Sequence, residues 1–476
     1  MKIDDDKFSR QVQGGQKWKT SKIQGSIKNG HGTLVYPTGF GKTFTTLLIC
    51  SNIIEANIEH DFDYTFHITV PSVPMKEQWE DKILDYFDSK AVLEKYFKIR
   101  VINTVMGALE RVSCYMSILD EIHEYVNEDR QALLRGDIVM TKFLLGLTAT
   151  YKDRKEVSDI LDVYCPVVDY ITEEEAIEEG WLSNFIEYNL GIDLKPDERK
   201  QYEHYSESIT ELLQMFGDQG FSLSTKCLGG GKDERGVELR NMEWCRKWAE
   251  ANGWKPNLPS TPENNEINKN WSPFAIIMYA KSLMAYTRKR KELLYNSNTK
   301  LDCAVEVLKK FNTLKTICFS QSTDFADELC DKLKDEIDEL VSVAYHSNLQ
   351  TQMLPNLKTG KVSKHGITRL KKRAIELFRS NVARIMCTAS ALDRGFDEND
   401  IDLGLTTSGT SNPIQYKQRG GRVKRVNKDG KYEKALLINI YFKHTKDQEW
   451  LTSRQYSSIH EIINVNTINE IKYEIK

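Results

Sequence analysis

The sequence lacks the features that mark a membrane, secreted or disulfide-bonded protein. No window approaches the roughly 18 consecutive apolar residues that a membrane-spanning helix requires. The start, MKIDDDKFSR, has no apolar run of the kind found in a secretory signal. The nine cysteines are scattered, and no two form a C-x-x-C pair. These absences predict free thiols and a cytoplasmic protein, or one of the nucleus or viral factory if the chain comes from a eukaryotic virus, but not a secreted one.

Charge of one sign is not in excess either. Lys and Arg number 66 against 69 Asp and Glu, so the formal net charge is −3. This balance excludes a histone-like polybasic protein. It does not exclude a nucleic-acid partner, because a local basic groove is enough to bind a phosphate backbone. At 476 residues the chain is too long for one compact core and predicts two or three domains.

Short apolar, β-rich runs separated by helical patterns occur in two sets. Buried strands that alternate with helices are typical of a parallel α/β sheet, so the predicted fold class is α/β with two such lobes in tandem. The first five runs are Thr33–Tyr36, Tyr64–Val70, Lys98–Asn103, Tyr115–Asp120 and Phe143–Thr148, and the second five are Leu314–Phe319, Val341–Tyr345, Ala383–Cys387, Leu403–Thr407 and Ala435–Ile440.

The stretch between the two sets has a different pattern. It contains helical patches at Tyr202–Met215, Glu238–Glu250 and Phe274–Leu294, and a Pro/Asn-rich segment, Lys255–Asn270, that predicts a flexible loop. We therefore expect a mostly helical insertion. The predicted domains are an N-terminal lobe at 1–186, the insertion at 187–300, a second lobe at 301–445 and a C-terminal tail at 446–476.

The segment Tyr36–Thr43 follows an apolar run and opens a helical pattern. Its two glycines allow a tight turn whose N–H groups form an anion site at the start of the helix. Lys42 would reach the β- and γ-phosphates, and the Thr43 hydroxyl would ligate Mg²⁺. The strict pattern has glycine at the position of Tyr36, so the match is one residue short, and an unrelated β–α turn is the alternative. The candidate nucleotide-binding residues are Thr38, Gly39, Gly41, Lys42 and Thr43.

Two carboxylates, Asp120 and Glu121, end a later apolar run. Carboxyl ends of parallel strands are where such sheets bind ligands. We expect Asp120 to hold Mg²⁺ and Glu121 to orient and deprotonate an attacking water. Alone, such a pair would be a solvated helix start. Thr148–Thr150 ends the next run, and its hydroxyls are expected to hydrogen-bond the acidic segment. Trp79 and His346 are interpreted as packing residues, and Glu173–Glu179 as a solvated helix.

A basic cluster, Gln418–Arg425, lies in the second lobe. Arg422 and Arg425 are three residues apart, so on a helix they share a face, and guanidinium groups brought to the γ-phosphate would neutralise its developing charge. A solvated basic helix or a grip on a phosphate backbone is the alternative. Gln418 is a further candidate nucleotide contact.

Together these residues resemble the superfamily 2 helicases and translocases. PTGFGKT is similar to motif I of that family, DEIH to motif II, TAT to motif III and QRGGRVKR to motif VI. Weaker similarities are those of Ile68–Trp79 to motif Ia, Thr104 to Ib, Ile317–Ser322 to IV and Thr388–Asp397 to V. The DEIH box and the QRGGR form resemble the UvsW and XPB-like branch, near the type III restriction translocases.

The resemblance implies two RecA-like lobes that close on ATP and Mg²⁺ while a nucleic-acid strand advances across them. It also implies that Gln16 reads the adenine base, with Gln11 and Gln13 as competitors. Two departures matter. In motif V, Thr388 is one residue further from Gly395 than is common, so Ala389 and Ser390 are the alternatives for its place in the motif. The accessory N-terminal DNA-binding domain of the similar proteins is not recognised in this sequence.

Two windows are basic despite the acidic total. Between Lys361 and Ser390 there are eight Lys and Arg against one acid, and between Lys281 and Lys300 six against one. Such runs suit a phosphate backbone, although they are usually solvated helix faces. We expect an ATP-dependent helicase or translocase whose partner is DNA rather than RNA, with no membrane and no obligate protein partner. An RNA helicase and a nucleotide-gated clamp are the alternatives, and a built-in metal-dependent nuclease is disfavoured.

Overall fold

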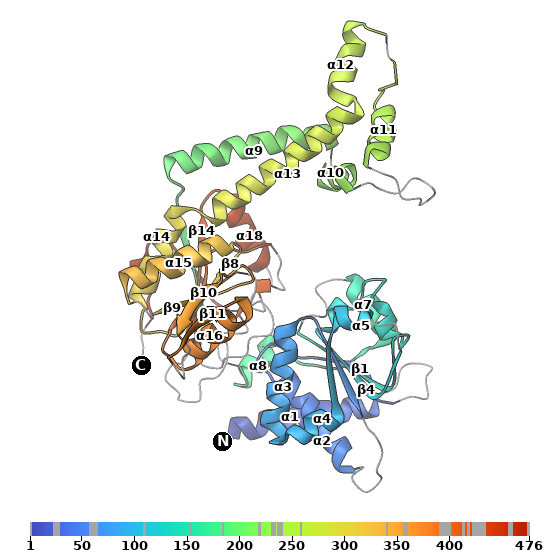
Figure 1. Cartoon of the computed structure of the whole chain (residues 1–476), viewed down its shortest axis with the longest axis vertical. Helices are drawn as coiled ribbons and strands as arrows, with labels where there is room; N and C mark the ends of the chain where they lie inside the picture. Colours follow the sequence, from blue (N-terminus) through green and yellow to red (C-terminus); the bar gives the residue numbers. More distant parts are fainter. Residues whose placement is uncertain are drawn as a thin grey trace. The chain divides into compact units, whose positions relative to one another are not determined.

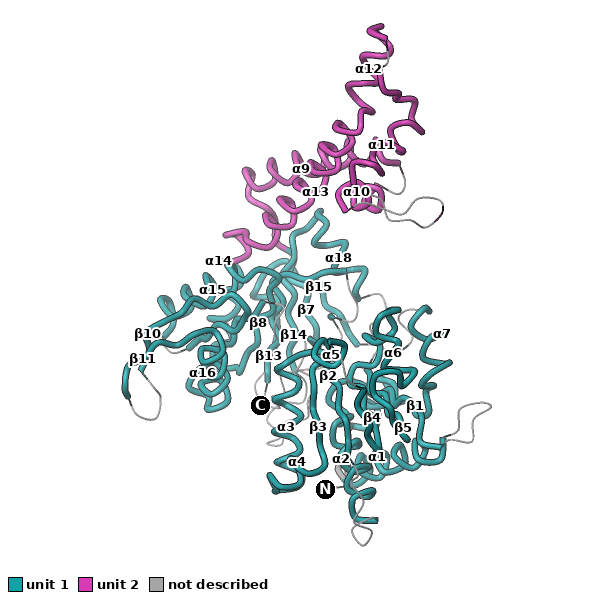
Figure 2. Tube along the Cα trace, turned by 45° about the vertical axis from the view of Figure 1, so that its right-hand side comes forward, with its two compact units in different colours: residues 1–191, 303–476 teal, residues 192–302 magenta. Residues whose placement is uncertain are grey.

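The protein consists of two compact units. The structure, a computed structural model, describes residues 2–21, 29–56, 65–107, 111–149, 151, 155–182, 185–217, 220–229, 235, 241–257, 259–338, 341–355, 360–389, 401–411, 415–416, 419–420, 435–455 and 460–473. Unit 1 comprises Met1–Gly191 with Cys303–Lys476, and unit 2 comprises Ile192–Asp302 (Figure 2). Both parallel sheets belong to unit 1, whereas unit 2 is helical (Figure 1).

The first sheet has six strands in the order β3-β2-β4-β5-β1-β6, and every neighbouring pair is parallel. All residues of β1 and β2 are buried, as expected of central parallel strands covered on both faces. The strands are β1 (His31–Val35), β2 (Phe66–Val70), β3 (Phe97–Val101), β4 (Val112–Asp120), β5 (Val139–Thr148) and β6 (Val167–Tyr170).

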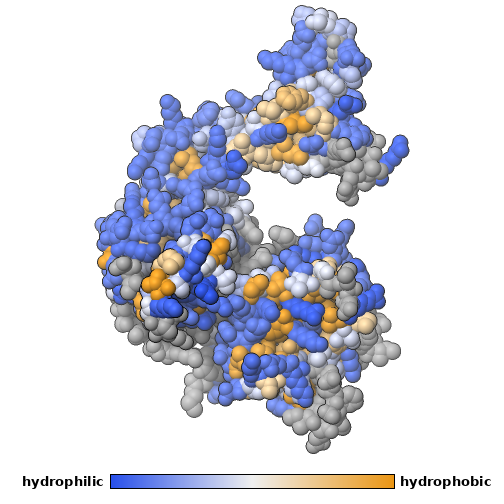
Figure 3. Space-filling view, in the orientation of Figure 1, coloured by the Kyte–Doolittle hydropathy of each residue, from blue (hydrophilic) through white to orange (hydrophobic). Residues whose placement is uncertain are grey.

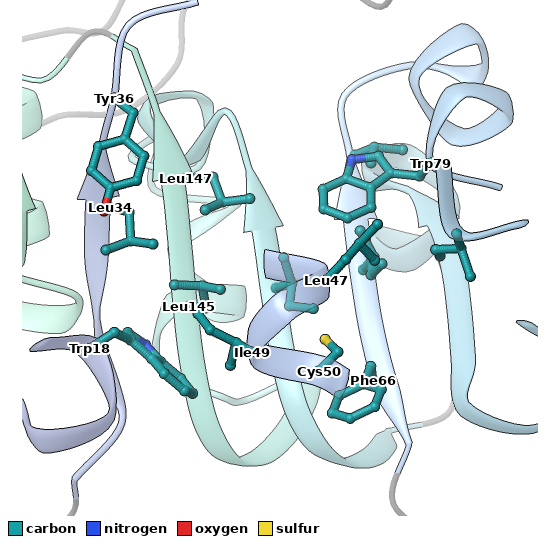
Figure 4. Packing of buried hydrophobic residues seen from close by; sticks show 14 of the residues in the cluster. Trp18, Leu34, Tyr36, Leu47, Ile49, Cys50, Phe66, Trp79, Leu145 and Leu147 are labelled. Carbon is teal, nitrogen blue, oxygen red and sulfur yellow. The ribbon is translucent and has the colours of Figure 1, made fainter. Parts of the chain in front are cut away.

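Helices connect and cover these strands. They are α1 (Lys2–Thr20), α2 (Lys42–Ala56), α3 (Val73–Phe87), α4 (Lys90–Tyr96), α5 (Ile102–Met106), α6 (Gln131–Leu134), α7 (Lys155–Tyr164) and α8 (Glu173–Glu178), with a 3₁₀ turn at Ile122–Glu124. The core between sheet and helices includes Leu34, Leu47 and Trp79, which project from β1, α2 and α3 (Figure 4). α1, which precedes the first strand in the chain, packs against α2, β1 and β6.

The second sheet has seven strands in the order β15-β7-β14-β13-β8-β12-β9. A two-stranded antiparallel hairpin, β10 (Gln352–Pro355) with β11 (Val362–His365), follows β9. The strands are β7 (Phe185–Ile192), β8 (Thr316–Ser320), β9 (Ser342–Tyr345), β12 (Ile385–Ala389), β13 (Leu403–Thr406), β14 (Ala435–Phe442) and β15 (Ile462–Val465). The accompanying helices are α14 (Asn298–Lys310), α15 (Thr323–Glu336), α16 (Ile367–Arg379) and α18 (Lys446–Gln455), with a 3₁₀ turn at Ile468–Glu470.

Unit 2 is built on two long helices, α9 (Pro196–Phe216) and α13 (Pro273–Tyr295), which pack along each other (Figure 1). The shorter helices α10 (Gly220–Gly229), α11 (Asn241–Ala251) and α12 (Pro262–Trp271) pack against α13. This unit has a hydrophobic core of its own, which includes Ile209, Ala280 and Leu283. At its base, Glu198 accepts hydrogen bonds from Ser297 Oγ at 2.5 Å and Thr299 Oγ1 at 2.9 Å.

All ten strands expected from the sequence are present, and so is the solvated helix expected at Glu173–Glu179. One expectation was wrong, because the Pro/Asn-rich segment expected as a loop contains α12. The side chain of Thr261 caps this helix by accepting from the N–H of Asn264, and Pro262 occupies its first turn. β7 and β15 belong to the second sheet, and the helical unit spans Ile192–Asp302 where 187–300 was expected.

The nine cysteines are all free, as predicted, and eight of them are buried. Among the described helices none is long and apolar enough to cross a bilayer. The surface is largely hydrophilic, and an apolar patch shows on the helical unit (Figure 3). Exposed apolar side chains of that unit include Phe221, Met242, Phe274 and Met278.

Candidate active site

The loop after β1 has the geometry of a phosphate-binding turn. β1 ends at Val35 and α2 begins at Lys42, and between them Gly39 and Gly41 have φ values of 91° and 112°. Any other residue would be strained in this left-handed region. A Cβ on Gly41 would also lie 2.5 Å from Nε2 of Gln11. The turn thus delivers the chain to the N-terminus of a four-turn helix, where backbone N–H groups attract anions.

Lys42 and Thr43, the first residues of α2, are both half-buried, as is Thr38 within the loop. Lys42 Nζ donates a hydrogen bond to the carbonyl of Tyr36 at 3.2 Å, so the side chain lies back across the loop. This bond to a neutral carbonyl can be exchanged for one to a phosphate oxygen, because hydrogen bonds between charged partners are stronger. The residues present therefore fit a nucleotide phosphate.

Tyr36, the residue that departs from the strict pattern, ties β1 to α1 and β6. Its hydroxyl donates to Oδ2 of Asp169 at 2.7 Å. The same carboxylate accepts from Arg10 at 2.6 and 3.0 Å and from Lys17 at 2.6 Å. Burial opposes ionisation of Asp169, but the hydrogen bonds from its three donors outweigh burial and lower its pKa. A glycine at position 36 would leave this carboxylate without its phenol donor, so the departure has a structural reason.

α1 supports the loop through Gln11. The Gln11 side chain is buried, and its Nε2 donates to the carbonyl of Phe40 at 2.8 Å. Gln16, the residue expected to read adenine, is exposed, and so is Gln13. Of the three glutamines considered, Gln11 is therefore the one that touches the phosphate loop, and the base-contacting role stays a proposal.

The acidic pair lies at the same edge of the sheet as the loop. Asp120 of β4 is in register with Leu147 of β5, and Thr148 of β5 is in register with Val35 of β1. The ends of β4, β5 and β1 are therefore side by side. Burial and the charge of Glu121 raise the pKa of Asp120 to about 6, although the hydrogen bond from Trp79 and the charge of Lys42 oppose the shift. The lysine of the loop thus acts electrostatically on the first carboxylate.

Trp79 of α3 is a site residue that the sequence did not reveal, since it was expected only to pack. Its indole N–H donates to Oδ2 of Asp120 at 2.8 Å, and Oδ1 of the same carboxylate accepts from the N–H of Glu121 at 3.0 Å. Both bonds favour the ionised carboxylate and fix its plane. In the sequence, the one signal for this role was that Trp79 ends the segment that resembles motif Ia.

Glu121 adopts a left-handed backbone conformation, with φ 53° and ψ 52°. Few non-glycine residues outside functional sites keep such a conformation. Its Oε2 lies 3.4 Å from Nδ1 of His123. His123 Nδ1 is also 2.9 Å from Oγ1 of Thr148, whose carbonyl accepts the N–H of Tyr36 at 3.0 Å. The expected hydrogen bond between the end of β5 and the acidic segment is therefore present, and it connects that segment to the phosphate loop.

The second lobe is described only in part around its motifs. Gln418, Arg422 and Arg425 lie outside the described residues, as do Ser390 to Asp397 of the motif V segment. Arg419 is buried, donates to the carbonyl of Ser408 at 3.0 Å, and has its guanidinium 5.2 Å from the ring centroid of Phe319. It therefore packs into the lobe rather than facing a ligand.

The basic windows remain candidates for a phosphate backbone. In α16, Lys371 Nζ lies 5.2 Å from the ring centroid of Tyr345, and burial lowers its pKa. Arg373 donates to the carbonyl of Pro355 at 2.5 Å, which ties α16 to the hairpin. Within the described part of the chain, no three His, Cys, Asp or Glu side chains are grouped as a metal site would require.

Two family models match the chain. Residues 8–153 match the family described as type III restriction enzyme, res subunit, and residues 299–427 match the helicase conserved C-terminal domain. These two matches lie on the two parallel-sheet lobes in the order that the motifs require. The chain belongs to the superfamily 2 helicases and translocases. Within that superfamily it falls in the type III restriction and XPB-like branch, and its two helicase domains imply ATPase activity and the use of ATP.

Individual proteins are also similar to this chain. The DNA 3'-5' translocase XPB2 of Sulfurisphaera tokodaii is 21% identical over 441 residues, which cover 90% of this chain and 82% of that protein. A solved structure of Dbp5 from S. cerevisiae, bound to RNA and ADP BeF3, has a TM-score of 0.52 at 14% identity and covers 97% of this chain and 93% of its own. Mss116p, bound to ssRNA and AMP-PNP, has a TM-score of 0.52 at 13% identity and covers 95% and 74%. The structural similarities show the fold alone.

Proposed function

We propose that this protein is an ATP-driven translocase or helicase that acts on DNA, with duplex or branched DNA as its substrate. The observation that carries the proposal is the meeting of a phosphate loop and an acidic pair at the ends of neighbouring strands, in a chain that holds both helicase domains. The similarity to a DNA translocase along 90% of the chain supports DNA as the partner.

The residues of the first lobe have separate roles in this proposal. Lys42 leaves the Tyr36 carbonyl and binds the terminal phosphates. Asp120 and the Thr43 hydroxyl hold Mg²⁺, which would neutralise charge on the transferred phosphoryl group. Glu121, held in its left-handed turn, orients the attacking water and accepts its proton. His123 and Thr148 connect this carboxylate to the phosphate loop, so loss of the terminal phosphate would change the position of both the loop and the carboxylate.

The second lobe supplies the remaining contacts. Gln418, Arg422 and Arg425 are proposed to face the nucleotide from motif VI, with the two arginines neutralising charge on the γ-phosphate. Gln11, or Gln16 if α1 reorganises on binding, is proposed to contact the base.

Steady-state ATP hydrolysis tests the proposal. It would be measured with no nucleic acid, single-stranded DNA, duplex DNA, four-way DNA and RNA, each at two salt concentrations. We expect stimulation by DNA that weakens as salt rises, because phosphate contacts release counterions. Stronger stimulation by RNA would assign the alternative substrate, since a protein that senses the 2'-OH distinguishes the two. An equal, weak rate under every condition would indicate a nucleotide-gated clamp.

Substitutions separate binding from chemistry at the same site. Lys42→Ala should abolish both nucleotide binding and turnover. Glu121→Gln should keep nucleotide binding but lower kcat by about a hundredfold or more, since it removes the group that accepts the proton. Glu128→Gln, an exposed carboxylate in the same loop region, is the matched control and should retain the parental rate. Normal turnover in either site variant would refute the assignment.

A further inference from the structure

β7 carries a carboxylate that is completely buried in the second lobe. Glu187 is 0% exposed, yet four side chains bring a polar hydrogen to it. Its Oε1 accepts from Nδ2 of Asn439 at 2.6 Å and from Nε2 of Gln455, and its Oε2 contacts the hydroxyl of Tyr416 and Nε2 of His460. Neither the catalytic proposal nor the motif pattern accounts for this carboxylate.

The four partners come from four separate parts of the lobe. Asn439 is on β14, Gln455 ends α18, His460 precedes β15, and Tyr416 lies in the helical residues 415–416. A second amide, Asn189 of β7, accepts from both Asn439 and Gln455 at 3.0 Å. Burying a carboxylate is costly unless it is fully hydrogen-bonded, and breaking one bond of such a network leaves an expensive charge behind. The network therefore holds its members in one arrangement.

Tyr416 is the member that connects the network to the nucleotide machinery. It lies two residues before Gln418, and the motif VI arginines follow it in the chain. The Tyr416 hydroxyl contacts Glu187 and lies 3.2 Å from Nε2 of His460. The guanidinium of Arg454 lies 5.9 Å from its ring centroid and donates to Oδ1 of Asn439 at 3.2 Å.

The same surroundings hold two arginines in a buried setting. Burial and the charge of Arg419 lower the pKa of Arg454 to about 10, although the charges of Asp447 and Glu187 oppose the shift. Glu187 thus also offsets the positive charge of Arg454, which lies near that of Arg419. A neutral side chain at position 187 would remove both a hydrogen-bond acceptor for Tyr416 and this compensation.

We propose that Glu187 and Tyr416 are positioning residues for the segment that follows Tyr416, so that the motif VI arginines meet the nucleotide in the orientation that hydrolysis requires. Neither residue touches the nucleotide in this proposal. The hydroxyl of Tyr416 is bonded to the sheet of the lobe at β7, and this bond fixes the start of the segment that carries Arg419, Arg422 and Arg425. The effect on hydrolysis rests on the proposed ATPase function, whereas the effect on the position of the segment after Tyr416 does not.

The test uses the full chain and the conservative variant Tyr416→Phe, which keeps the ring that packs on Arg454. We expect DNA-stimulated kcat to fall about tenfold, since a hydrogen bond to a charged acceptor is lost, while the KM for ATP stays within about twofold. Affinity for ADP with aluminium fluoride should fall by a similar factor, whereas affinity for ADP alone should not change. Glu187→Gln should shift the same quantities in the same direction.

Tyr188→Phe is the matched control. Tyr188 is a buried neighbour on β7 whose hydroxyl donates to the carbonyl of Lys472 at 2.9 Å, away from motif VI. Both variants lose a phenol hydrogen bond, and Tm should fall more in Tyr416→Phe because its acceptor is a buried carboxylate. Equal losses of kcat in the two variants, or no loss in Tyr416→Phe, would show that the network only stabilises the fold and would overturn the proposal.

Hydrogen–deuterium exchange gives a readout that does not depend on activity. In the protein without nucleotide, the peptide that covers residues 415–425 should exchange faster in Tyr416→Phe than in the parental chain and in Tyr188→Phe. If the parental protein hydrolyses no ATP, the proposed function fails, and the exchange comparison still decides this inference. Unchanged exchange in that peptide would refute it even if kcat falls.

Discussion

His67 shows at the residue scale how a buried titratable group links the stability of the first lobe to pH. It is fully buried on β2, with Oγ1 of Thr69 3.3 Å from its Nδ1. Burial, together with the charges of Arg100 and Lys98, lowers the pKa of His67 to about 4. An unfolded histidine titrates near 6.5. Between these values the unfolded chain binds more protons than the folded one, so stability rises with pH in this window and is lost as the pH falls.

Replacing this histidine should remove that dependence. The His67→Asn variant keeps a polar atom near Thr69 but cannot be protonated, so its stability should fall less between pH 7 and pH 4.5. For one group with this pKa shift, protonation of the unfolded chain lowers the free energy of unfolding by about 2 kcal/mol at pH 4.5. Unfolding by urea at several pH values would measure it. His444→Asn, at an exposed position with a φ of 58° that asparagine tolerates, should show the parental dependence. Parallel pH curves for parent and His67→Asn would contradict the assignment.

The residues of the nucleotide site differ in how far the sequence could predict them. Lys42 was expected from the glycines that precede it after an apolar run, and Asp120 and Glu121 because they end another run, since parallel strands end at one edge of their sheet. Trp79 and Gln11 could not be found in this way. Trp79 is 41 residues from its partner Asp120, and Gln11 is 29 residues from Phe40. Such contacts depend on how a helix docks on the sheet, which local pattern does not encode.

At the scale of the element, the close packing of α1 beside the phosphate loop depends on one of its two adjacent glycines. A Cβ on Gly14 would lie 1.8 Å from the hydroxyl oxygen of Tyr36, whereas one on Gly15 would lie 3.2 Å from Cγ1 of Ile49. The Tyr36 hydroxyl is held by Asp169 and cannot move aside without losing that bond. Gly14 thus permits the close approach of α1 that brings Gln11 to the loop.

The two glycines offer a paired test of this fit. Gly14→Ala should push α1 away, which lowers stability by about 1–3 kcal/mol through overpacking and raises the KM for ATP severalfold. Gly15→Ala should change stability by less than about 1 kcal/mol, since the helix preference of alanine offsets a tight but flexible contact. Thermal unfolding and ATP titrations would measure both effects. An equal response of the two variants would show that the Tyr36 contact does not position the helix.

Three of the strands that the sequence failed to predict, β6, β10 and β15, share a physical reason, whereas the missed strand β7 is mostly buried. The predicted central strands, such as β1 and β8, are buried along their whole length and read as continuous apolar runs. The edge strands β6 and β15 are buried at only one residue each, and β10 at none. A half-exposed strand of four residues has no run to detect. α12 was missed likewise, because none of its residues is buried and only the Thr-Pro start marks it.

At the scale of the whole molecule, the helical unit has a core separate from the two sheets. Leu283 of α13 is 0% exposed in that core, and Leu34 of β1 is 0% exposed in the core of the first lobe. The same substitution in the two places should therefore have different functional effects, although each leaves a cavity of similar kind.

Leu283→Ala should destabilise the helical unit by about 2–5 kcal/mol and leave the affinity for ATP within about twofold of the parental value. Leu34→Ala should cost a similar free energy but weaken ATP binding, because β1 leads directly into the phosphate loop. Hydrogen exchange resolved by segment would locate each loss, and nucleotide titrations would show its effect. Weakened ATP binding in Leu283→Ala would show that the units are energetically coupled.

The pairing of β7 with β15 also has a consequence for the order of synthesis. These strands are parallel neighbours, with Glu187 in register with Ile462. On the ribosome, β7 emerges directly after the first lobe is complete, yet both strands that lie beside it, β14 and β15, are translated much later. The helical unit and most of the second lobe must be made in between. The first lobe and the helical unit can therefore fold as they emerge, whereas the edge of the second sheet closes only after β15 has been made.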